Sequence, residues 1–125
     1  MNIHVHIIPH KQQRYDTCGD WFYDTNNTLH IKVSELPDAR FERLVAIHEI
    51  IEATLCDEAN VDEADVTAFD LAYERNRPVG DLSEPGNDSK APYHRQHMLA
   101  SIIEQHLALE LGVDWKEYEK ALNEL

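Results

Sequence analysis

The sequence predicts an α+β fold in which an N-terminal strand and a β-hairpin are followed by four helices. Apolar and polar residues alternate in the first third of the chain, which is the period of a half-buried strand. Later segments place apolar residues three and four positions apart and begin with residues that cap helices. With 125 residues and no internal repeat, the chain is expected to form a single domain over residues 1–125.

The first strand is predicted at residues 2–8, where isoleucine and valine alternate with His4 and His6. The apolar residues are expected to face the core, and the two histidines fall on the opposite side, where they are expected to be exposed. Residues 9–20 carry proline and glycine among polar residues and are expected to form a connection.

The hairpin is predicted from two runs, residues 20–24 and 28–33, that are separated by Thr25 and two asparagines. Asparagine tolerates the left-handed backbone conformation that a tight hairpin turn needs. Apolar and polar residues alternate cleanly in the second run. His30 belongs to its polar side and is likewise expected to be exposed.

The first helix is predicted from about Asp38 to about Glu58, because Pro37 suits a first turn and Asp38 suits a cap. A second helix is expected to open near Asp62. Residues 76–92 are rich in Pro, Gly, Asp and Ser and are expected to form a long loop. Loops of this length inside a domain are uncommon and often functional, so this loop is expected to flank the cleft in which the protein acts.

The third helix is predicted from Pro92 to about Leu111, with Gly112 as its stop. It is apolar around most of its circumference and is therefore expected to be mostly buried. The fourth helix begins at Asp114, which forms a capping pair with Glu117.

The charge balance excludes some classes of function. The chain has 24 acidic residues against 11 Lys and Arg, and its formal net charge is −13. Nonspecific nucleic-acid binding and binding to anionic membranes both need clustered positive charge, so neither is expected. The acidic excess favours cation binding or a basic protein partner. No apolar run approaches the roughly 20 residues that span a bilayer, and no secretory signal is visible, so a cytoplasmic location is expected.

The strongest chemical signal is the sequence His48-Glu49-Ile50-Ile51-Glu52 in the first predicted helix. Residues four apart in a helix project over one patch, so His48 and Glu52 can offer two ligands to one metal ion. In metallopeptidases with the HExxH pattern, the glutamate after the first histidine is the general base. The pair also lies within an apolar arc of the helix, where an unpartnered imidazole and carboxylate would be costly.

A third ligand is expected from the one polar stripe of helix 93–111. The stripe consists of His94, His97, Ser101 and Glu104. His97 is the first choice and His94 the second. Together with the two ligands of the motif, His97 would make a His2Glu set with an open fourth position, which is typical of catalytic zinc. Glu104 is a candidate outer carboxylate that orients His97.

These features together resemble small zincin-like proteins of phages and prophages, and distantly the metallopeptidase domain of the ImmA/IrrE type. The resemblance covers roughly residues 20–111, from LHIKVSELPDARFERLVAIHEIIEA through APYHRQHMLASIIE. It implies that His48 and Glu52 bind zinc, that Glu49 is the catalytic acid/base of a peptidase or amide hydrolase, and that a later residue completes the site. For a phage-encoded protein the compartment would be the host cytoplasm, and the substrate a peptide or protein.

The motif departs from the HExxH pattern at its last position, which holds Glu52 instead of histidine. A carboxylate ligand adds negative charge and makes the metal a weaker Lewis acid. It could also admit divalent ions other than zinc.

A function of another class stays open at this point. The chain could be a non-catalytic acidic interaction protein of phage type that binds a host protein, with its metal site structural or absent. Residues 57–89 contain ten Asp or Glu against Arg75 and Arg77, and this segment would be the binding surface. In that case His48 and Glu52 would only hydrogen-bond to each other.

Overall fold

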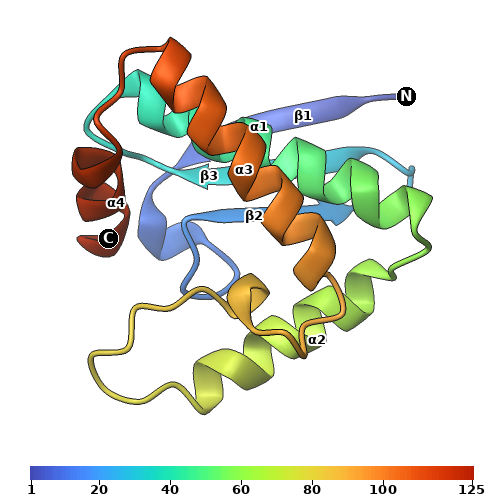
Figure 1. Cartoon of the computed structure of the whole chain (residues 1–125). Coiled ribbons are helices and arrows are strands. Elements are labelled where there is room, and N and C mark those ends of the chain that lie inside the picture. Colours follow the sequence, from blue (N-terminus) through green and yellow to red (C-terminus); the bar gives the residue numbers. More distant parts are fainter.

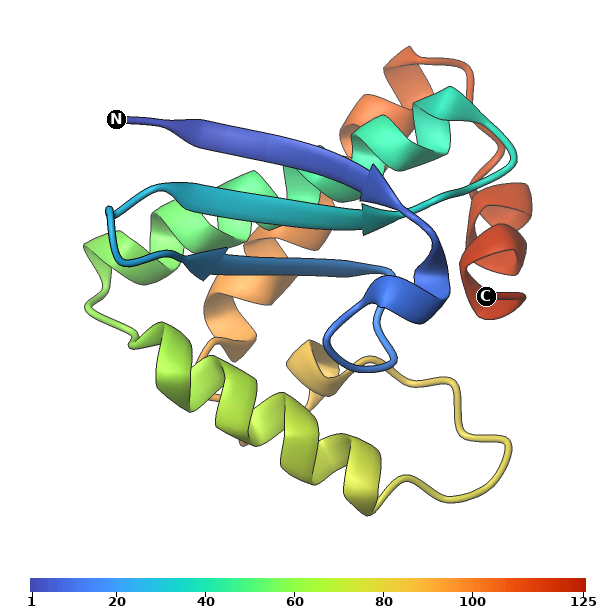
Figure 2. The same ribbon diagram turned by 180° about the vertical axis from the view of Figure 1, so that it is seen from behind.

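The sheet comes first along the chain and is followed by four α-helices, which confirms the predicted α+β fold (Figure 1). The computed structural model describes residues 1–125. The strands are β1 (Ile3–Ile8), β2 (Gly19–Tyr23) and β3 (Leu29–Ser34), and their spatial order is β1-β3-β2. The central strand β3 pairs antiparallel with β2 and parallel with β1 (Figure 2).

The hairpin of β2 and β3 is confirmed, and its turn uses asparagine as expected. Asn27 has a φ of 59°, in the left-handed region. Asp24 Oδ1 accepts hydrogen bonds from the backbone N–H groups of Asn26 and Thr28 at 2.8 and 3.0 Å. These local bonds fix the turn. The chain passes from β1 to β2 through a connection that contains the short 3-10 helix η1 (His10–Gln12).

The two paired strands β1 and β3 differ in burial. The core-facing residues of β3 are 0–2% exposed: Leu29, Ile31 and Val33. Their partners on β1 face the same side but are 40–46% exposed: Ile3, Val5 and Ile7. The expectation that these residues lie in the core is met only in part, because β1 is an edge strand and the helix behind the sheet packs on β2 and β3. On the other face His4 is exposed as predicted, whereas His6 and His30 are half-buried.

Two long helices lie on one face of the sheet. α1 (Ala39–Glu58) packs on β2 and β3, and α3 (His94–Glu110) packs on α1 (Figures 1 and 2). α1 begins as predicted at Asp38, whose side chain accepts a hydrogen bond from the N–H of Arg40 at 2.8 Å. The α1–α3 contact brings the middle of the chain against a segment near its C-terminal end.

The remaining helices are capped as the sequence predicts. α2 (Glu63–Arg75) begins after Asp62, and α4 (Trp115–Asn123) begins after Asp114, and each aspartate accepts backbone N–H groups of its helix. The long loop after α2 contains the 3-10 helix η2 (Pro85–Asn87), which packs against α3. The loop therefore ends beside one of the two long helices.

α3 turns its polar stripe inward, as the expected third ligand requires, but it is much less buried than expected. Its polar positions His97 and Glu104 are buried, together with Ala100 and Ala108. Large apolar side chains around it are exposed instead: Met98, Leu99, Ile102, Ile103, Leu109 and Leu111. The prediction of a mostly buried helix was wrong, because small alanines let α3 approach α1 with its polar stripe inward. None of the helices is both long enough and apolar enough to cross a membrane.

Candidate metal centre

Three potential metal ligands meet between α1 and α3. His48 and Glu52 lie four residues apart on α1, and His97 comes from α3. His48 Nε2 lies 3.3 Å from Glu52 Oε2 and 3.2 Å from His97 Nδ1. His97 Nδ1 lies 2.9 Å from Glu52 Oε2, and all three residues are only 4–6% exposed. The structure thus brings together the three residues that the sequence singled out as candidate ligands.

The triangle of donor atoms has the size that a tetrahedral ion requires. Zinc binds histidine nitrogen and carboxylate oxygen at about 2.0–2.2 Å, so two ligands of one tetrahedron lie roughly 3.3 Å apart. The observed separations of 2.9–3.3 Å are close to that value. The same distances also allow the three groups to hydrogen-bond to one another, so a further observation must separate an ion site from a hydrogen-bonded triad.

The charges around the triad favour an ion. Four carboxylates surround two imidazoles: Glu49, Glu52, Glu84 and Glu104. No lysine or arginine forms an ion pair with any of these carboxylates. Of the four, Glu52 and Glu104 are buried, Glu49 is half-buried and Glu84 is exposed. Buried carboxylates need a positive partner, which protonated histidines supply without a metal and a divalent cation would supply with one.

The ring of His48 is fixed from its far side. Its Nδ1 donates a hydrogen bond to Glu104 Oε1 at 2.8 Å, and the hydroxyl of Tyr118 on α4 donates to the other oxygen of Glu104 at 2.5 Å. A carboxylate on one ring nitrogen sets the tautomer and presents the lone pair of the other nitrogen to a metal. The prediction that Glu104 orients His97 was wrong, because Glu104 lies two turns after His97 on α3 and faces His48 on α1.

Glu52 is held as an anion. Trp21 Nε1 donates to Glu52 Oε1 at 2.9 Å, so the other oxygen is the one that faces the histidines. Burial by itself would raise the pKa of Glu52, but hydrogen bonds with His48 and His97 lower it to about 2. The carboxylate is therefore ionised at neutral pH, which is the form that binds a metal.

His97 is supported from the long loop. Its Nδ1 faces Glu52, and its Nε2 lies 2.9 Å from Glu84 Oε2, an ion-pair distance without the alignment of a hydrogen bond. Burial opposes protonation, but Glu52 and Glu84 together raise the pKa of His97 to about 9. Glu84 belongs to the 76–92 loop, which does flank the site as the sequence predicted. The sequence singled out the loop but not Glu84.

The loop also approaches His97 through Gly86. A Cβ at this position would lie 2.3 Å from Cγ of the His97 ring, so a side chain there would displace the ring. His94, the second-choice ligand, donates from Nδ1 to the carbonyl of Gly86 at 2.9 Å and is not part of the triad. His94 therefore fastens the loop to α3.

Glu49, the predicted general base, is half-buried and lines a cavity together with the triad. Gly19 of β2 leaves room for it, since a Cβ there would lie 2.6 Å from Glu49 Oε1. Burial raises the pKa of Glu49 well above its ordinary value and the charge of Glu52 raises it further, whereas His48 opposes the shift. A raised pKa suits a group that must accept a proton and release it again near neutral pH.

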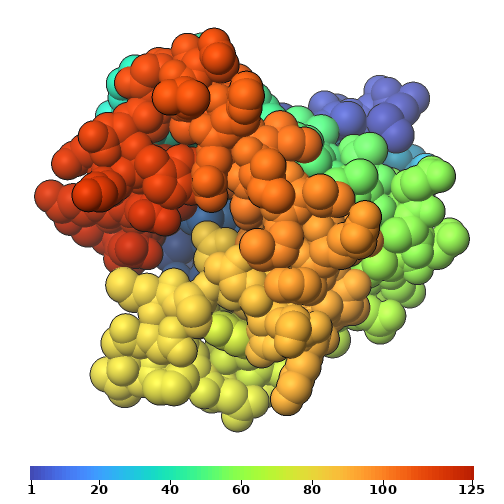
Figure 3. Space-filling view, in the orientation of Figure 1, coloured from blue at the N-terminus to red at the C-terminus, as the bar shows by residue number.

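The cavity has a volume of about 550 Å³. It is bordered by α3, α4 and the 76–92 loop. Figure 3 shows the hollow between these orange, red and yellow segments, with blue residues of the N-terminal third at its floor. Besides the four carboxylates around the triad, its lining carries further acidic side chains: Asp16, Asp20, Asp70, Glu74, Asp81 and Glu119. A bound molecule would therefore meet a strongly acidic wall.

A buried aspartate at this wall is a feature that sequence reasoning missed. Asp70 is 7% exposed and accepts hydrogen bonds from the hydroxyls of Tyr15 at 2.7 Å and Tyr93 at 2.5 Å. The ring of Tyr93 packs edge-on against that of His97, with centroids 6.1 Å apart. Burial raises the pKa of Asp70 to about 6, although both hydrogen bonds oppose the shift. Its partners lie 55 and 23 residues away in the chain, so no local pattern marks the group.

Comparison of the chain with protein-family models, with curated proteins and with solved structures found no match. What the chain does must therefore be inferred from the chemistry of the site itself, because a fold alone does not determine function.

Proposed function

We propose that this protein is a zinc-dependent hydrolase of peptide or amide bonds with a small zincin-like fold. His48, Glu52 and His97 are its metal ligands, and Glu49 is its general base. The observation that carries the proposal is the convergence of two imidazoles and a carboxylate beside a cavity that also holds Glu49. Three protein ligands with room for a fourth are typical of catalytic zinc sites. The cytoplasm, or the host cytoplasm for a phage-encoded protein, is part of the same proposal.

The chain supplies the proton transfer and the orientation of its ligands through its own carboxylates. A bound zinc ion contributes Lewis acidity and lowers the pKa of a coordinated water toward about 7. Glu49 takes the proton of the attacking water and passes it to the leaving amine, a double role that its raised pKa supports. Glu104 keeps the ring of His48 in the tautomer that leaves Nε2 unprotonated.

The acidic wall of the cavity favours a cationic substrate. Arg77 is the one lysine or arginine in the lining, and it is already paired with Glu74 and Asp81. A peptide with lysine or arginine near the scissile bond would complement these charges. A nucleic acid does not suit a chain with a net charge of −13. With Glu52 among the ligands, another divalent ion could replace zinc.

A second candidate function is binding to a host protein, with the metal kept as a structural tie between α1 and α3. The exposed apolar residues of α3 favour it, because contiguous apolar surface is typical of interaction sites. The acidic segment 57–89 is the other surface available to such a partner.

The first experiment measures the zinc content of untagged protein purified without added metal. The wild type is compared with His97→Gln, which removes a ligand, and with His106→Gln, which changes an exposed histidine outside the site. We expect His97→Gln to lose one equivalent of zinc and His106→Gln to lose none. Equal zinc content in all three proteins, each shown to be folded by circular dichroism, would contradict the metal site.

A further inference from the structure

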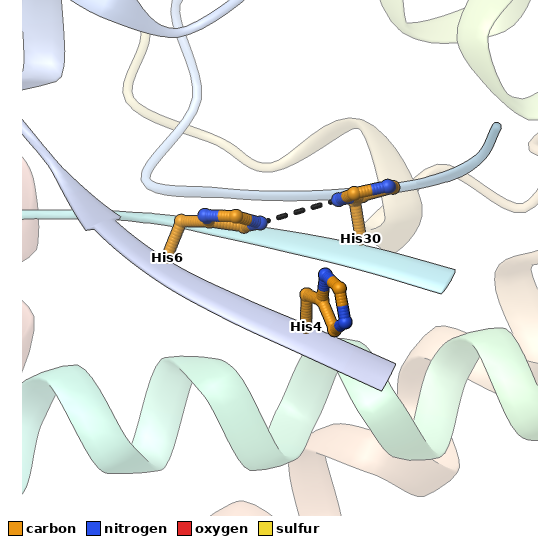
Figure 4. Close-up of side chains that lie close together, drawn as sticks. All are labelled: His4, His6 and His30. Carbon is orange, nitrogen blue, oxygen red and sulfur yellow. Dashed lines mark hydrogen bonds between the residues drawn. The ribbon is translucent and has the colours of Figure 1, made fainter. Parts of the chain in front are cut away.

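A second group of histidines gathers on the face of the sheet opposite α1. His4 and His6 come from β1, and His30 comes from β3 (Figure 4). The parallel register places His4 directly beside His30 and His6 beside Lys32. Paired residues of neighbouring strands project to the same face, so all three rings leave the sheet on one side. These three residues are called the open cluster below.

The nitrogens of the open cluster are close enough to share one ion. His6 Nε2 lies 3.2 Å from His30 Nδ1, and each of the three histidines offers a nitrogen within 4.8 Å of the others. Figure 4 shows the rings of His6 and His30 nearly coplanar and joined end to end, with His4 turned across them. The separation of His6 and His30 matches the roughly 3.3 Å between two ligands of one tetrahedral zinc ion.

The ring of His30 is oriented by groups outside the open cluster. Its Nε2 lies 2.8 Å from Asp24 Oδ2, and its ring stacks on Phe22 with centroids 5.4 Å apart. The guanidinium of Arg14 covers Phe22 at 4.6 Å from the ring centroid. Because an ionised carboxylate only accepts hydrogen bonds, Asp24 places the proton of a neutral His30 on Nε2. The Nδ1 lone pair then points toward His6, in the carboxylate–histidine arrangement that supports metal ligands elsewhere.

We propose that His4, His6 and His30 form a second metal site, independent of the buried triad, that binds Zn²⁺ or a similar divalent transition-metal ion. Three imidazoles without a thiolate or a ligand carboxylate suit zinc, copper and nickel and do not suit magnesium or calcium. The site bridges the edge strand β1 to the hairpin. The core-facing residues of β1 are 40–46% exposed, so apolar burial holds this strand less firmly than β3. A metal bridge would therefore stabilise the attachment of β1.

Lys32 limits the affinity of the open cluster. It lies beside His6 in the register and projects to the same face, so its positive charge opposes a bound cation. Replacing Lys32 by methionine keeps most of the apolar stem and removes the charge. The Lys32→Met variant is expected to bind zinc severalfold more tightly than the wild type.

The test is a calorimetric titration of the untagged, chelator-treated chain with Zn²⁺ alone. The wild type is expected to take up one more equivalent than His4→Gln, whereas the matched control His106→Gln takes up as much as the wild type. The side chain of His4 is exposed and forms no hydrogen bond, and glutamine can keep the strand pairing of its backbone, so His4→Gln is expected to leave the fold intact. The difference in zinc uptake between the wild type and His4→Gln measures binding at the open cluster, whether or not the buried triad also binds zinc.

Hydrogen exchange supplies a second readout for the bridging role. Zinc is expected to slow amide exchange in residues 3–8 of the wild type and not in His4→Gln. Equal zinc uptake by the wild type and His4→Gln would overturn the proposal. A loss in His106→Gln as large as that in His4→Gln would overturn it too, because uptake would then be nonspecific.

Discussion

The buried triad and the open cluster are both built from histidines of distant segments, but they differ in what surrounds the donor atoms. The triad is 4–6% exposed, includes Glu52, and has outer contacts from Glu104 and Trp21. The open cluster contains imidazoles only, and Asp24 is its single outer carboxylate. One site lies between helices and lines the 550 Å³ cavity, and the other lies on a sheet face and is not part of that cavity.

The difference separates two uses of a metal ion. A desolvated site with an anionic ligand and a base beside it can hold an ion tightly and act on a substrate. A partly exposed site of neutral ligands is expected to hold an ion more weakly and to exchange it more readily, which suits a bridge between strands better than catalysis. The residue types differ only by the one carboxylate, Glu52. The hydrogen bonds to the outer ring nitrogens and the exposed fractions also distinguish the two sites.

The largest expected effect is that of Glu49→Gln on hydrolysis. Loss of the general base should reduce the rate on a cationic peptide by about 10²–10⁴-fold, because a positioned acid/base contributes that much. Zinc content at the triad should not change, since Glu49 is not a ligand. Rates from a chromogenic peptide assay and metal analysis of the same samples check both halves. Loss of zinc together with activity would mean that Glu49 is itself a ligand, and the triad would then have no separate base beside it.

The next effect is a pH dependence of the free energy of unfolding. Its sign differs between Asp70, which lines the cavity of the triad, and Asp24, which contacts the open cluster. The pKa of Asp70, raised from 3.8 to about 6, means that the folded protein binds its proton more tightly than the unfolded chain. This contribution to stability is present below about pH 4 and is lost as the pH rises through 6, by about 3 kcal/mol at most. Urea unfolding from pH 4 to 7 should therefore give a flatter profile for Asp70→Asn than for the wild type.

Asp24 provides the control for that measurement. The hydrogen bond with His30 lowers the pKa of Asp24, so its contribution is present above pH 4 and is lost only as the pH falls below its ordinary value. Asp24→Asn should leave the profile between pH 4 and 7 parallel to that of the wild type. An Asp24→Asn profile as flat as that of Asp70→Asn would show that Asp70 is not the source of the slope.

Replacing the outer carboxylate of the triad is expected to have a smaller effect. Glu104→Gln keeps a hydrogen-bond acceptor for His48 Nδ1 but removes the charge that makes the ring a stronger ligand. Zinc affinity of the triad should fall by about 10–100-fold, as is usual for such outer partners. Competition with a chelating dye measures it. Unchanged affinity would mean that Glu104 only packs between α3 and α4.

The smallest effect is expected from the corresponding change at the open cluster. The side chain of Asp24 is 35% exposed, so solvent partly screens the charge that Asp24→Asn removes. Zinc affinity there should fall by less than about tenfold, below the loss expected for Glu104→Gln. The same dye competition, applied to both variants, ranks them. A larger loss for Asp24→Asn would reverse the ranking of the two sites.

Local sequence patterns predicted most of the elements and part of the triad. Capping by Asp38, Asp62 and Asp114 and the left-handed Asn27 depend on neighbouring residues, so they can be read along the chain. The four-residue spacing of His48 and Glu52 is equally local. His97 could be singled out because it lies on the single polar stripe of an otherwise apolar helix.

The remaining features depend on contacts between distant segments. The partner of Glu104, the exposure of the apolar side chains of α3, and the approach of Glu84 to His97 all follow from how helices and loop pack. The open cluster was overlooked for the same reason. The alternation in each strand predicts only that His4 and His30 lie on its polar side, and the parallel register of β1 and β3 places them side by side.

That register also has a consequence for the order in which the molecule assembles. The hairpin closes through neighbouring residues and such turns form within microseconds, whereas β1 must find β3 across a gap of 24 residues between His6 and His30. Parallel pairing over such a distance is slow, so β1 is expected to dock late. His30 is then in position before His4 and His6 arrive, and zinc can bridge them only after the rate-limiting barrier. Zinc should accordingly slow unfolding of the chain while leaving its refolding rate unchanged.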